Sequence, residues 1–229
     1  MTSRVVMDIE TVPIAWDDLD EQERDYLLKY CKNPQEEERV RGEMGLFPLT
    51  GRVIVIGLLN PDTDRALVLA EGVPGEGSGW AHDEGIEYWT GNEIEMLERF
   101  WDVIRKYHKI ITFNGRSFDG PYIMMRSMVL GIPASRNLVP NRYRTDDHLD
   151  LLDILTHFGL TRRYSLDFYM RRMGFESPKE ALSGKDVAAA YSEGRIEDIA
   201  RYCREDIIAT ARLLRRFEET VGPVINERS

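Results

Sequence analysis

A short apolar run near the N-terminus, residues 5–12, contains two acidic residues, Asp8 and Glu10. Side chains alternate between the faces of a β-strand, so these carboxylates point to the same face with Cα atoms about 6.5 Å apart. Their neighbours are too apolar for a solvated edge, which favours a central strand with the acids near its end. Two adjacent carboxylates repel each other, and a divalent cation with oxygen ligands relieves that repulsion. The triplet alone is a weak signal, because such triplets more often mark a solvated strand end.

The length of 229 residues suits one α/β domain with insertions, and we expect residues 1–229 to form a single domain. The two cysteines, Cys31 and Cys203, have neither zinc-site nor disulfide spacing, which indicates a reducing compartment. No segment resembles a signal peptide or a membrane span. We therefore expect a cytoplasmic protein that does not bind membranes.

Charge is distributed unevenly along the chain. The net charge is −10, but residues 1–103 carry 9 Lys and Arg against 23 Asp and Glu, whereas residues 104–216 carry 20 against 14. The acidity is therefore local to the N-terminal part. The basic second half offers a surface for phosphate groups, although an ordinary Arg-rich helical exterior explains the same excess.

The order of the expected elements is that of a mixed sheet flanked by helices. Residues 52–59 and 65–70 predict two strands that continue the first one as a meander. The segment 16–50 predicts an acidic insertion with a short helix around 20–31, and the glycine-rich segment 71–90 predicts a flexible loop. The remaining pattern predicts, in turn, a helix ending near 107, a strand over 109–113, and helices over 120–130, 149–158, 165–173, 184–193 and 196–218.

Two further acids stand out by their positions. Asp119 falls where the strand over 109–113 gives way to a helix, and helix capping explains an Asp there well. Asp206 falls inside the apolar seam of the last helix, although a carboxylate is seldom buried without a partner or a metal. Tyr202 lies one turn earlier on the same face, so its hydroxyl can reach the same space. An arginine partner is the alternative explanation for Asp206.

Three pieces of the sequence, read together, resemble the three motifs of the DEDD superfamily of exonucleases. They are Asp8-Ile9-Glu10, the stretch TFNGRSFDGPY over 112–122, and the stretch YCRED over 202–206. The middle piece closely resembles the second motif of the proofreading domain of B-family DNA polymerases, and the last resembles the tyrosine subclass. The resemblance runs over most of the chain, roughly residues 3–218, and extends to stand-alone predicted 3′–5′ exonucleases related to that domain. The resemblance implies a ribonuclease-H-like α/β fold, a mixed β-sheet flanked by α-helices.

The resemblance also implies a metal-dependent hydrolytic site. Four carboxylates would hold two Mg²⁺ or Mn²⁺ ions: Asp8, Glu10, Asp119 and Asp206. Tyr202 would orient the attacking water. Four residues would contact the 3′-terminal nucleotide: Asn114 by a hydrogen bond, Phe118 by packing beside the bases, and Ile9 and Thr11 at the sugar. Core packing is the alternative explanation for Phe118. Two more acids, Asp150 and Asp153, are expected to cap a helix or line its outside.

The activity that the resemblance implies is 3′–5′ hydrolysis of single-stranded DNA with release of nucleoside 5′-monophosphates. The same site acting on RNA is one alternative, because little in the sequence reports how a ribose 2′-hydroxyl is treated. A non-catalytic nucleic-acid-binding or polymerase-associated module is another, but such a module needs neither the four acids nor the tyrosine. The overall acidity predicts modest, salt-dependent affinity, or a replication or repair protein that delivers the strand end.

Overall fold

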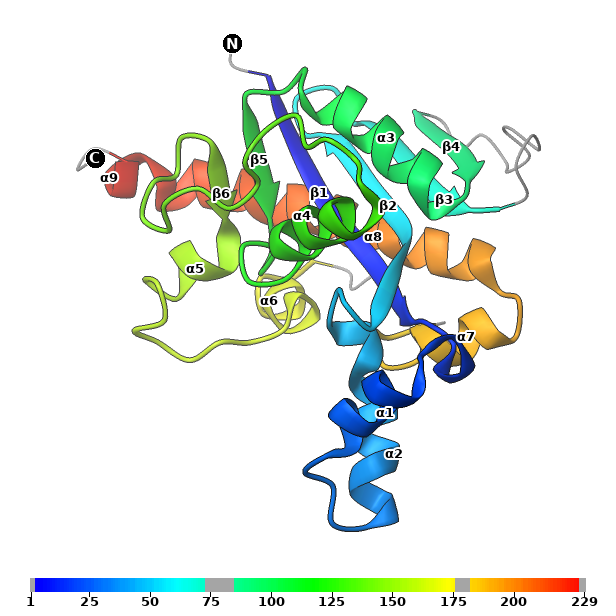
Figure 1. Ribbon diagram of the computed structural model, residues 1–229. Coiled ribbons are helices and arrows are strands. Elements are labelled where there is room, and N and C mark those ends of the chain that lie inside the picture. The colour runs from blue at the N-terminus through cyan, green and yellow to red at the C-terminus, as the bar shows by residue number, and fades with distance from the viewer. Residues whose placement is uncertain (1–2, 73–84, 176–181, 227–229) are drawn as a thin grey trace.

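The computed structural model of the chain describes residues 3–72, 85–175 and 182–226. Its centre is a six-stranded mixed sheet in the order β4-β3-β2-β1-β5-β6. Helices pack on both faces of this sheet (Figure 1). The predicted α/β fold with a mixed sheet flanked by helices is confirmed.

The central strand β1 (Arg4–Pro13) is longer than the apolar run that predicted it. It pairs antiparallel with β2 (Gly51–Asn60), which pairs antiparallel with β3 (Arg65–Glu71), so the predicted meander is confirmed. On the other side of β1, β5 (Lys109–Thr112) pairs in parallel with residues 4–6. Because β5 ends there, the part of β1 that carries the two acids has no strand beside it on this side among the described residues.

Two edge strands were not predicted. β4 (Ile86–Gly91) pairs in parallel with β3, so the predicted loop over 71–90 is wrong in its last part, and residues 73–84 lie outside the described residues. β6 (His148–Asp150) pairs in parallel with β5, and the helix predicted over 149–158 starts only after it, as α5 (Leu151–Leu155). A three-residue strand is too short to show an alternating pattern.

The helices divide the side chains of β1 between two cores. On one face, α3 (Glu93–Ile104) and α4 (Asp119–Leu130) cover residues 5, 7 and 9. On the other, α8 (Ile196–Thr220) crosses β1, β2 and β3. Three shorter helices pack against α8: α6 (Leu166–Arg172), α7 (Val187–Ser192) and α9 (Gly222–Asn226). Strand alternation therefore turns Asp8 and Glu10 toward α8.

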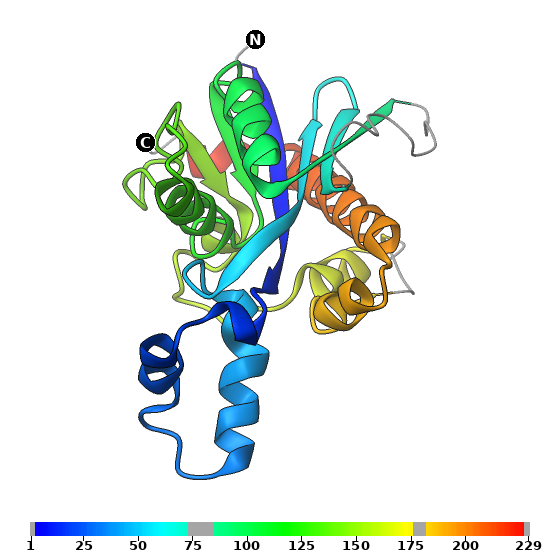
Figure 2. The same ribbon diagram turned by 45° about the vertical axis from the view of Figure 1, so that its right-hand side comes forward.

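The acidic insertion is a pair of helices that projects from the body of the protein (Figure 2). The predicted helix is α1 (Glu21–Leu28), but the prediction missed α2 (Pro34–Glu43), which Asn33 caps with Pro34 at its first position. Neither helix has a buried residue. The insertion is fixed at its base, because the carbonyl of Gly45 accepts hydrogen bonds from Thr11 Oγ1 at 2.8 Å and from the Tyr122 hydroxyl at 3.0 Å.

Gly57 lets α8 lie close to the sheet. It pairs with Asp8 in the β1–β2 ladder, and a Cβ at this position would lie 2.9 Å from Cys203 Sγ and 3.0 Å from Ile207 Cγ2. We therefore expect Gly57→Ala to lower the free energy of unfolding by about 1–3 kcal/mol and to move α8 away from the acids.

Thermal unfolding tests this expectation, and a second substitution separates the clash from other effects of the added methyl group. Cys203→Ala removes the nearer clashing atom, so Gly57→Ala/Cys203→Ala should unfold at a higher temperature than Gly57→Ala. Equal unfolding temperatures for the wild type and Gly57→Ala would contradict the role given to Gly57.

No helix in the described ranges 3–72, 85–175 and 182–226 combines the length and the apolar character that crossing a membrane requires.

Candidate functional site

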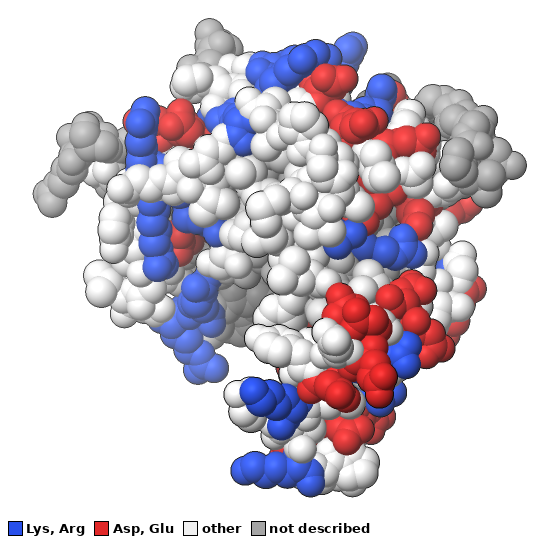
Figure 3. All heavy atoms as spheres, in the orientation of Figure 1, with Lys and Arg blue, Asp and Glu red and all other residues white. Residues whose placement is uncertain are grey.

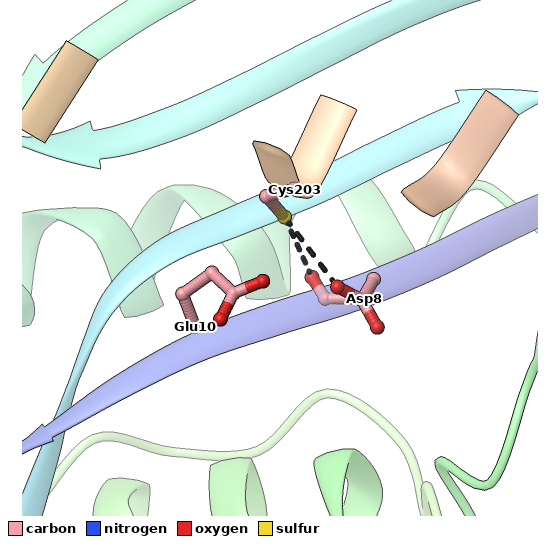
Figure 4. A group of neighbouring side chains, drawn as sticks. All are labelled: Asp8, Glu10 and Cys203. Atoms are coloured by element: carbon pink, nitrogen blue, oxygen red, sulfur yellow. Dashed lines mark hydrogen bonds between the residues drawn. The ribbon is translucent and has the colours of Figure 1, made fainter. Parts of the chain in front are cut away.

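The side chains of Asp8 and Glu10 lie next to each other on β1 and face Cys203 of α8 (Figure 4). The Cys203 thiol donates to the backbone oxygen and to Oδ2 of Asp8, both at 3.7 Å. One oxygen from each carboxylate and the Cys203 sulfur all lie within 4.8 Å of one another. The two acids therefore share a face, as the sequence predicts.

Asp119 approaches Asp8 and Glu10 from α4, which lies on the other face of the sheet from α8. It is the first residue of α4, and its Oδ1 accepts a hydrogen bond from the Ile9 N–H at 3.0 Å. That N–H is free for Asp119 because β5 ends before it. The N-cap of α4 is Phe118, which makes no side-chain cap bond, so capping does not explain Asp119. A Cβ on Gly115 would lie 2.9 Å from Asp119 Oδ2, so a glycine leaves the space that this carboxylate occupies.

Asp206 and Tyr202 complete the group from α8. Both are half-buried, and the Tyr202 hydroxyl and the Asp206 carboxylate interact with each other, one turn apart on the same face. Within the described part of the chain, no Arg or Lys forms an ion pair with Asp206. The alternative of an arginine partner is therefore not supported, and the one-turn spacing of these two side chains has the geometry that the sequence predicts.

Burial and the charges of neighbouring acids raise the pKa of all four carboxyl groups. Burial, followed by the charges of the other acids, raises the pKa of Asp8 and of Glu10 well above the usual range. Burial is also the main reason that the pKa of Asp119 rises to about 7 and that of Asp206 to about 6. Without a cation, the site therefore holds protons that ordinary carboxyl groups would lose.

The negative charges of the clustered acids also affect Tyr202 and Cys203. Burial, and then the charge of Asp206, raises the pKa of Tyr202. Burial, and then the charge of Asp8, raises the pKa of the Cys203 thiol. Both groups stay protonated at neutral pH, so the Tyr202 hydroxyl is available there as a hydrogen-bond donor. A protonated thiol is a poor metal ligand, which leaves the carboxylate oxygens as the donor set.

Two other buried acids of the protein differ from these four because each pairs with an arginine. Glu93 pairs with Arg126 at 2.7 Å, and Asp153 pairs with Arg142 at 2.8 Å. Among the residues that the structure describes, no Lys, Arg or His lies within ion-pair distance of the four clustered acids. Clustered carboxylate oxygens without a cation fit a hard divalent ion such as Mg²⁺ or Mn²⁺.

Asp150 caps α5, as the sequence predicts, and it also fixes the turn after β5. Its carboxylate accepts from the backbone N–H groups of Leu152 and Asp153 in α5, and from those of Asn114 at 3.0 Å and Arg116 at 2.8 Å. Asp153 is only 2% exposed, so its expected place on the outside of a helix is wrong. Asp150 thus holds the 114–116 turn that leads to Asp119, and Asp153 lies 3.9 Å from the Arg116 guanidinium.

The residues expected to contact a nucleotide surround the acids, but their contacts stay predictions. Asn114 has a φ of 70°, and its Oδ1 accepts a hydrogen bond from Arg163. Phe118 is half-buried, with its ring centroid 5.4 Å from that of Tyr122. The Ile9 side chain is 4% exposed and packs in the core, so its backbone is the part that lies beside the site.

Two neighbours of the site were not among the predicted residues. Cys203 lies within the third motif, and its place three residues before Asp206 on a helix was a usable signal. Arg163 is 49 residues from Asn114, and nothing in the sequence indicates that the two pair.

Above pH 6.5, the stability of the metal-free protein is expected to fall as the pH rises. The unfolded chain has already lost its carboxyl protons there, whereas folded Asp119, with a pKa of about 7, still holds part of its proton, and the raised pKa values of Asp8 and Glu10 act in the same direction. The folded state binds more protons, so a rising pH disfavours it. His148 has a pKa lowered to about 4 by burial and acts in the opposite direction, but only below its ordinary value of 6.5.

Thermal unfolding in chelator at pH 6.5 and pH 8 measures this effect. The unfolding temperature should be lower at pH 8, and added Mn²⁺ should remove most of the difference. A metal-free unfolding temperature that stays level or rises over this interval would contradict the pKa shifts of the cluster.

Two acids on the central strand β1, a third at the start of α4 and a fourth on the crossing helix α8 lie on a mixed sheet of the ribonuclease-H-like kind. Residues 82–228 match the family described as "predicted 3′–5′ exonuclease related to the exonuclease domain of PolB". The chain belongs to this family, which confirms the resemblance seen in its motifs. The matched region contains Asp119, Tyr202 and Asp206, whereas Asp8 and Glu10 precede it.

Several archaeal DNA polymerases are similar to this chain. The DNA polymerase of Pyrococcus glycovorans is 34% identical over 144 residues, which cover 56% of this chain and 18% of the polymerase. DNA polymerase 1 of Saccharolobus solfataricus is 31% identical over 199 residues, which cover 77% of this chain and 22% of the polymerase. The chain thus spans about a fifth of the length of these relatives.

Proposed function

We propose that the protein is a divalent-metal-dependent 3′–5′ exonuclease of the tyrosine subclass that removes nucleoside 5′-monophosphates from single-stranded DNA. The observation that carries the proposal is the group of four carboxylates without a cationic partner: Asp8, Glu10, Asp119 and Asp206. Family membership supports the 3′–5′ direction. The polymerase relatives favour DNA as the substrate over RNA.

The carboxylates would hold two Mg²⁺ or Mn²⁺ ions. When bound, such ions supply Lewis acidity: they lower the pKa of water and neutralise charge on the phosphoryl group in the transition state. Asp8 and Glu10 present their oxygens from one strand face, and Asp119 and Asp206 present theirs from two helices. Because three rigid elements supply the ligands, the site needs little rearrangement to bind metal.

The other residues of the site would orient the reactants. Tyr202 keeps its proton and would donate a hydrogen bond that orients the attacking water. Asn114 and Phe118, on the turn that leads into α4, would contact the 3′-terminal nucleotide, and Thr11 with the Ile9 backbone would lie beside its sugar. We also propose a cytoplasmic setting, and a replication or repair protein as the partner that delivers strand ends.

Single strands of DNA and of RNA, each labelled at one end, test the proposal. With Mg²⁺ or Mn²⁺, 5′-labelled DNA should shorten one nucleotide at a time, and a 3′ label should be released as a mononucleotide. Chelator and Asp8→Asn should each abolish the reaction. Asp25→Asn, which neutralises an exposed acid of α1, is the matched control and should retain it.

The possible outcomes distinguish between the alternative functions of the site. Digestion of RNA but not DNA would show that the substrate is RNA, and the proposed mechanism would still hold. Binding of both polymers without cleavage would overturn the proposal in favour of a non-catalytic module.

A further inference from the structure

We propose that the exposed segment from Arg162 to Phe168 binds the single strand on the 5′ side of the nucleotide that is removed. The proposal rests on the exonuclease function and specifies where the rest of the substrate lies. It concerns four side chains that project from this segment and that no motif of the site includes: Arg162, Arg163, Tyr164 and Phe168.

The two arginines of the segment carry positive charge that no described carboxylate neutralises, because its one acid, Asp167, pairs with Arg171 at 2.8 Å. Arg162 and Arg163 are exposed, and neither has a carboxylate within ion-pair distance among the described residues. Figure 3 shows Lys and Arg side chains gathered at the lower left, over the stretch between α5 and α6, whereas Asp and Glu side chains gather on the side of the insertion. An acidic protein with four clustered carboxylates needs such a local cation source to hold a polyanion.

The aromatic side chains of the segment form a stacked, exposed pair. The rings of Tyr164 and Phe168 lie 4.5 Å apart at an interplanar angle of 13°. They are 38% and 44% exposed, so ring surface remains open to solvent. The Arg162 guanidinium lies 5.1 Å from the Tyr164 ring centroid. Arginines beside open aromatic rings are the combination that binds single strands without sequence preference, through phosphates and stacked bases.

Contacts from Arg163 and Tyr164 attach this segment to the residues that follow β5 and lead to Asp119. Arg163 donates to Asn114 Oδ1, on the turn between β5 and Asp119. The Tyr169 ring lies 6.1 Å from that of Tyr164 and 5.8 Å from that of Phe113, which directly follows β5. The segment therefore starts at the residue expected to bind the terminal nucleotide and leads away from it. A strand with its 3′ end at the acids would meet these arginines and rings with its next nucleotides.

Equilibrium binding of labelled oligodeoxythymidylates in Ca²⁺ tests the proposal. The test variant is Arg162→Gln/Tyr164→Ser, which leaves Arg163 and its bond to Asn114 in place. It should bind a 12-nucleotide strand about 10–100-fold more weakly than the wild type, whereas the affinity for a dinucleotide should change much less. The matched control is Arg212→Gln/Tyr26→Ser, which makes the same exchanges at exposed positions on α8 and α1.

A milder variant guards against misfolding as the cause. Arg162→Gln alone should weaken binding of the 12-nucleotide strand and reduce the slope of log affinity against log salt by about 0.7, the value for one phosphate contact. Equal binding of the long strand by the wild type and both variants, or equal losses for the long strand and the dinucleotide, would overturn the proposal.

Hydrolysis in Mg²⁺ is measured separately on the same proteins. A wild type that binds the strand through this segment but cleaves nothing would refute the exonuclease function and leave the binding surface in place. Cleavage that is the same in wild type and variants at limiting strand concentration would refute the surface and leave the function.

Discussion

Replacing Asp119 by Asn is expected to stabilise the metal-free protein at pH 8 and to abolish its nuclease activity. Ionising Asp119 is costly in the folded state, since its pKa is about 7 instead of the ordinary 3.8. At about 1.4 kcal/mol per pKa unit, neutralisation relieves a cost on the order of 4 kcal/mol. The Asn oxygen can still accept the Ile9 N–H. The loss of a metal ligand should lower kcat/KM by about 10³-fold or more.

Asp150→Asn is the matched control because it makes the same change at a buried acid that has partners. The Asp150 carboxylate accepts from several backbone N–H groups, so an amide at this position loses acceptors and should lower the unfolding temperature. Thermal unfolding in chelator and hydrolysis in Mn²⁺ measure the two effects. If Asp119→Asn is destabilised as Asp150→Asn is, the ionised Asp119 carboxylate does not destabilise the folded protein, and the prediction is wrong.

Tyr202→Phe and Asp206→Asn are expected to separate orientation of the water from metal binding. Tyr202 keeps its proton throughout the working pH range, so losing its hydroxyl should lower kcat about 10²-fold and leave Mn²⁺ affinity nearly unchanged. Asp206→Asn should weaken Mn²⁺ binding and abolish activity together. Calorimetric titration with Mn²⁺ and single-turnover kinetics distinguish the two variants.

The pH profile adds an independent check on Tyr202. A tyrosine that acts as a donor leaves the alkaline side of the profile unchanged when it is replaced by Phe. A shift of that limb in Tyr202→Phe would make the tyrosine a base, and equal Mn²⁺ affinity in the wild type and Asp206→Asn would refute the ligand assignment.

The parts of the fold that sequence predicts well are those with long, regular apolar patterns. The meander, α3, α4 and α8 all bury a continuous face, so their periodicity is strong. The edge strands β4 and β6 are short, and β4 adjoins a glycine-rich stretch, so pattern alone could not separate them from loop and helix. α2 buries nothing, and its signal was the Asn33-Pro34 start and not periodicity.

The site shows the same division between local and distant information. Asp8 and Glu10 share a face because strands alternate, and Tyr202 and Asp206 share one because helices turn every 3.6 residues. Asp119 can accept a hydrogen bond from the Ile9 N–H because β5 ends before it reaches Ile9. The end of β5 is set by strand pairing across the sheet and not by the local sequence. The pairing of Arg163 with Asn114 and the burial of Asp153 are tertiary contacts that no local pattern encodes.

The central claim is that divalent ions bind among the four carboxylates, and anomalous scattering from crystals grown with Mn²⁺ tests it most directly. We expect Mn²⁺ peaks among the carboxylate oxygens of four residues: Asp8, Glu10, Asp119 and Asp206. In crystals of Asp119→Asn, these peaks should be lost or clearly reduced. Peaks only at other acidic surfaces, or no change in the Asp119→Asn crystals, would contradict the assignment of this site.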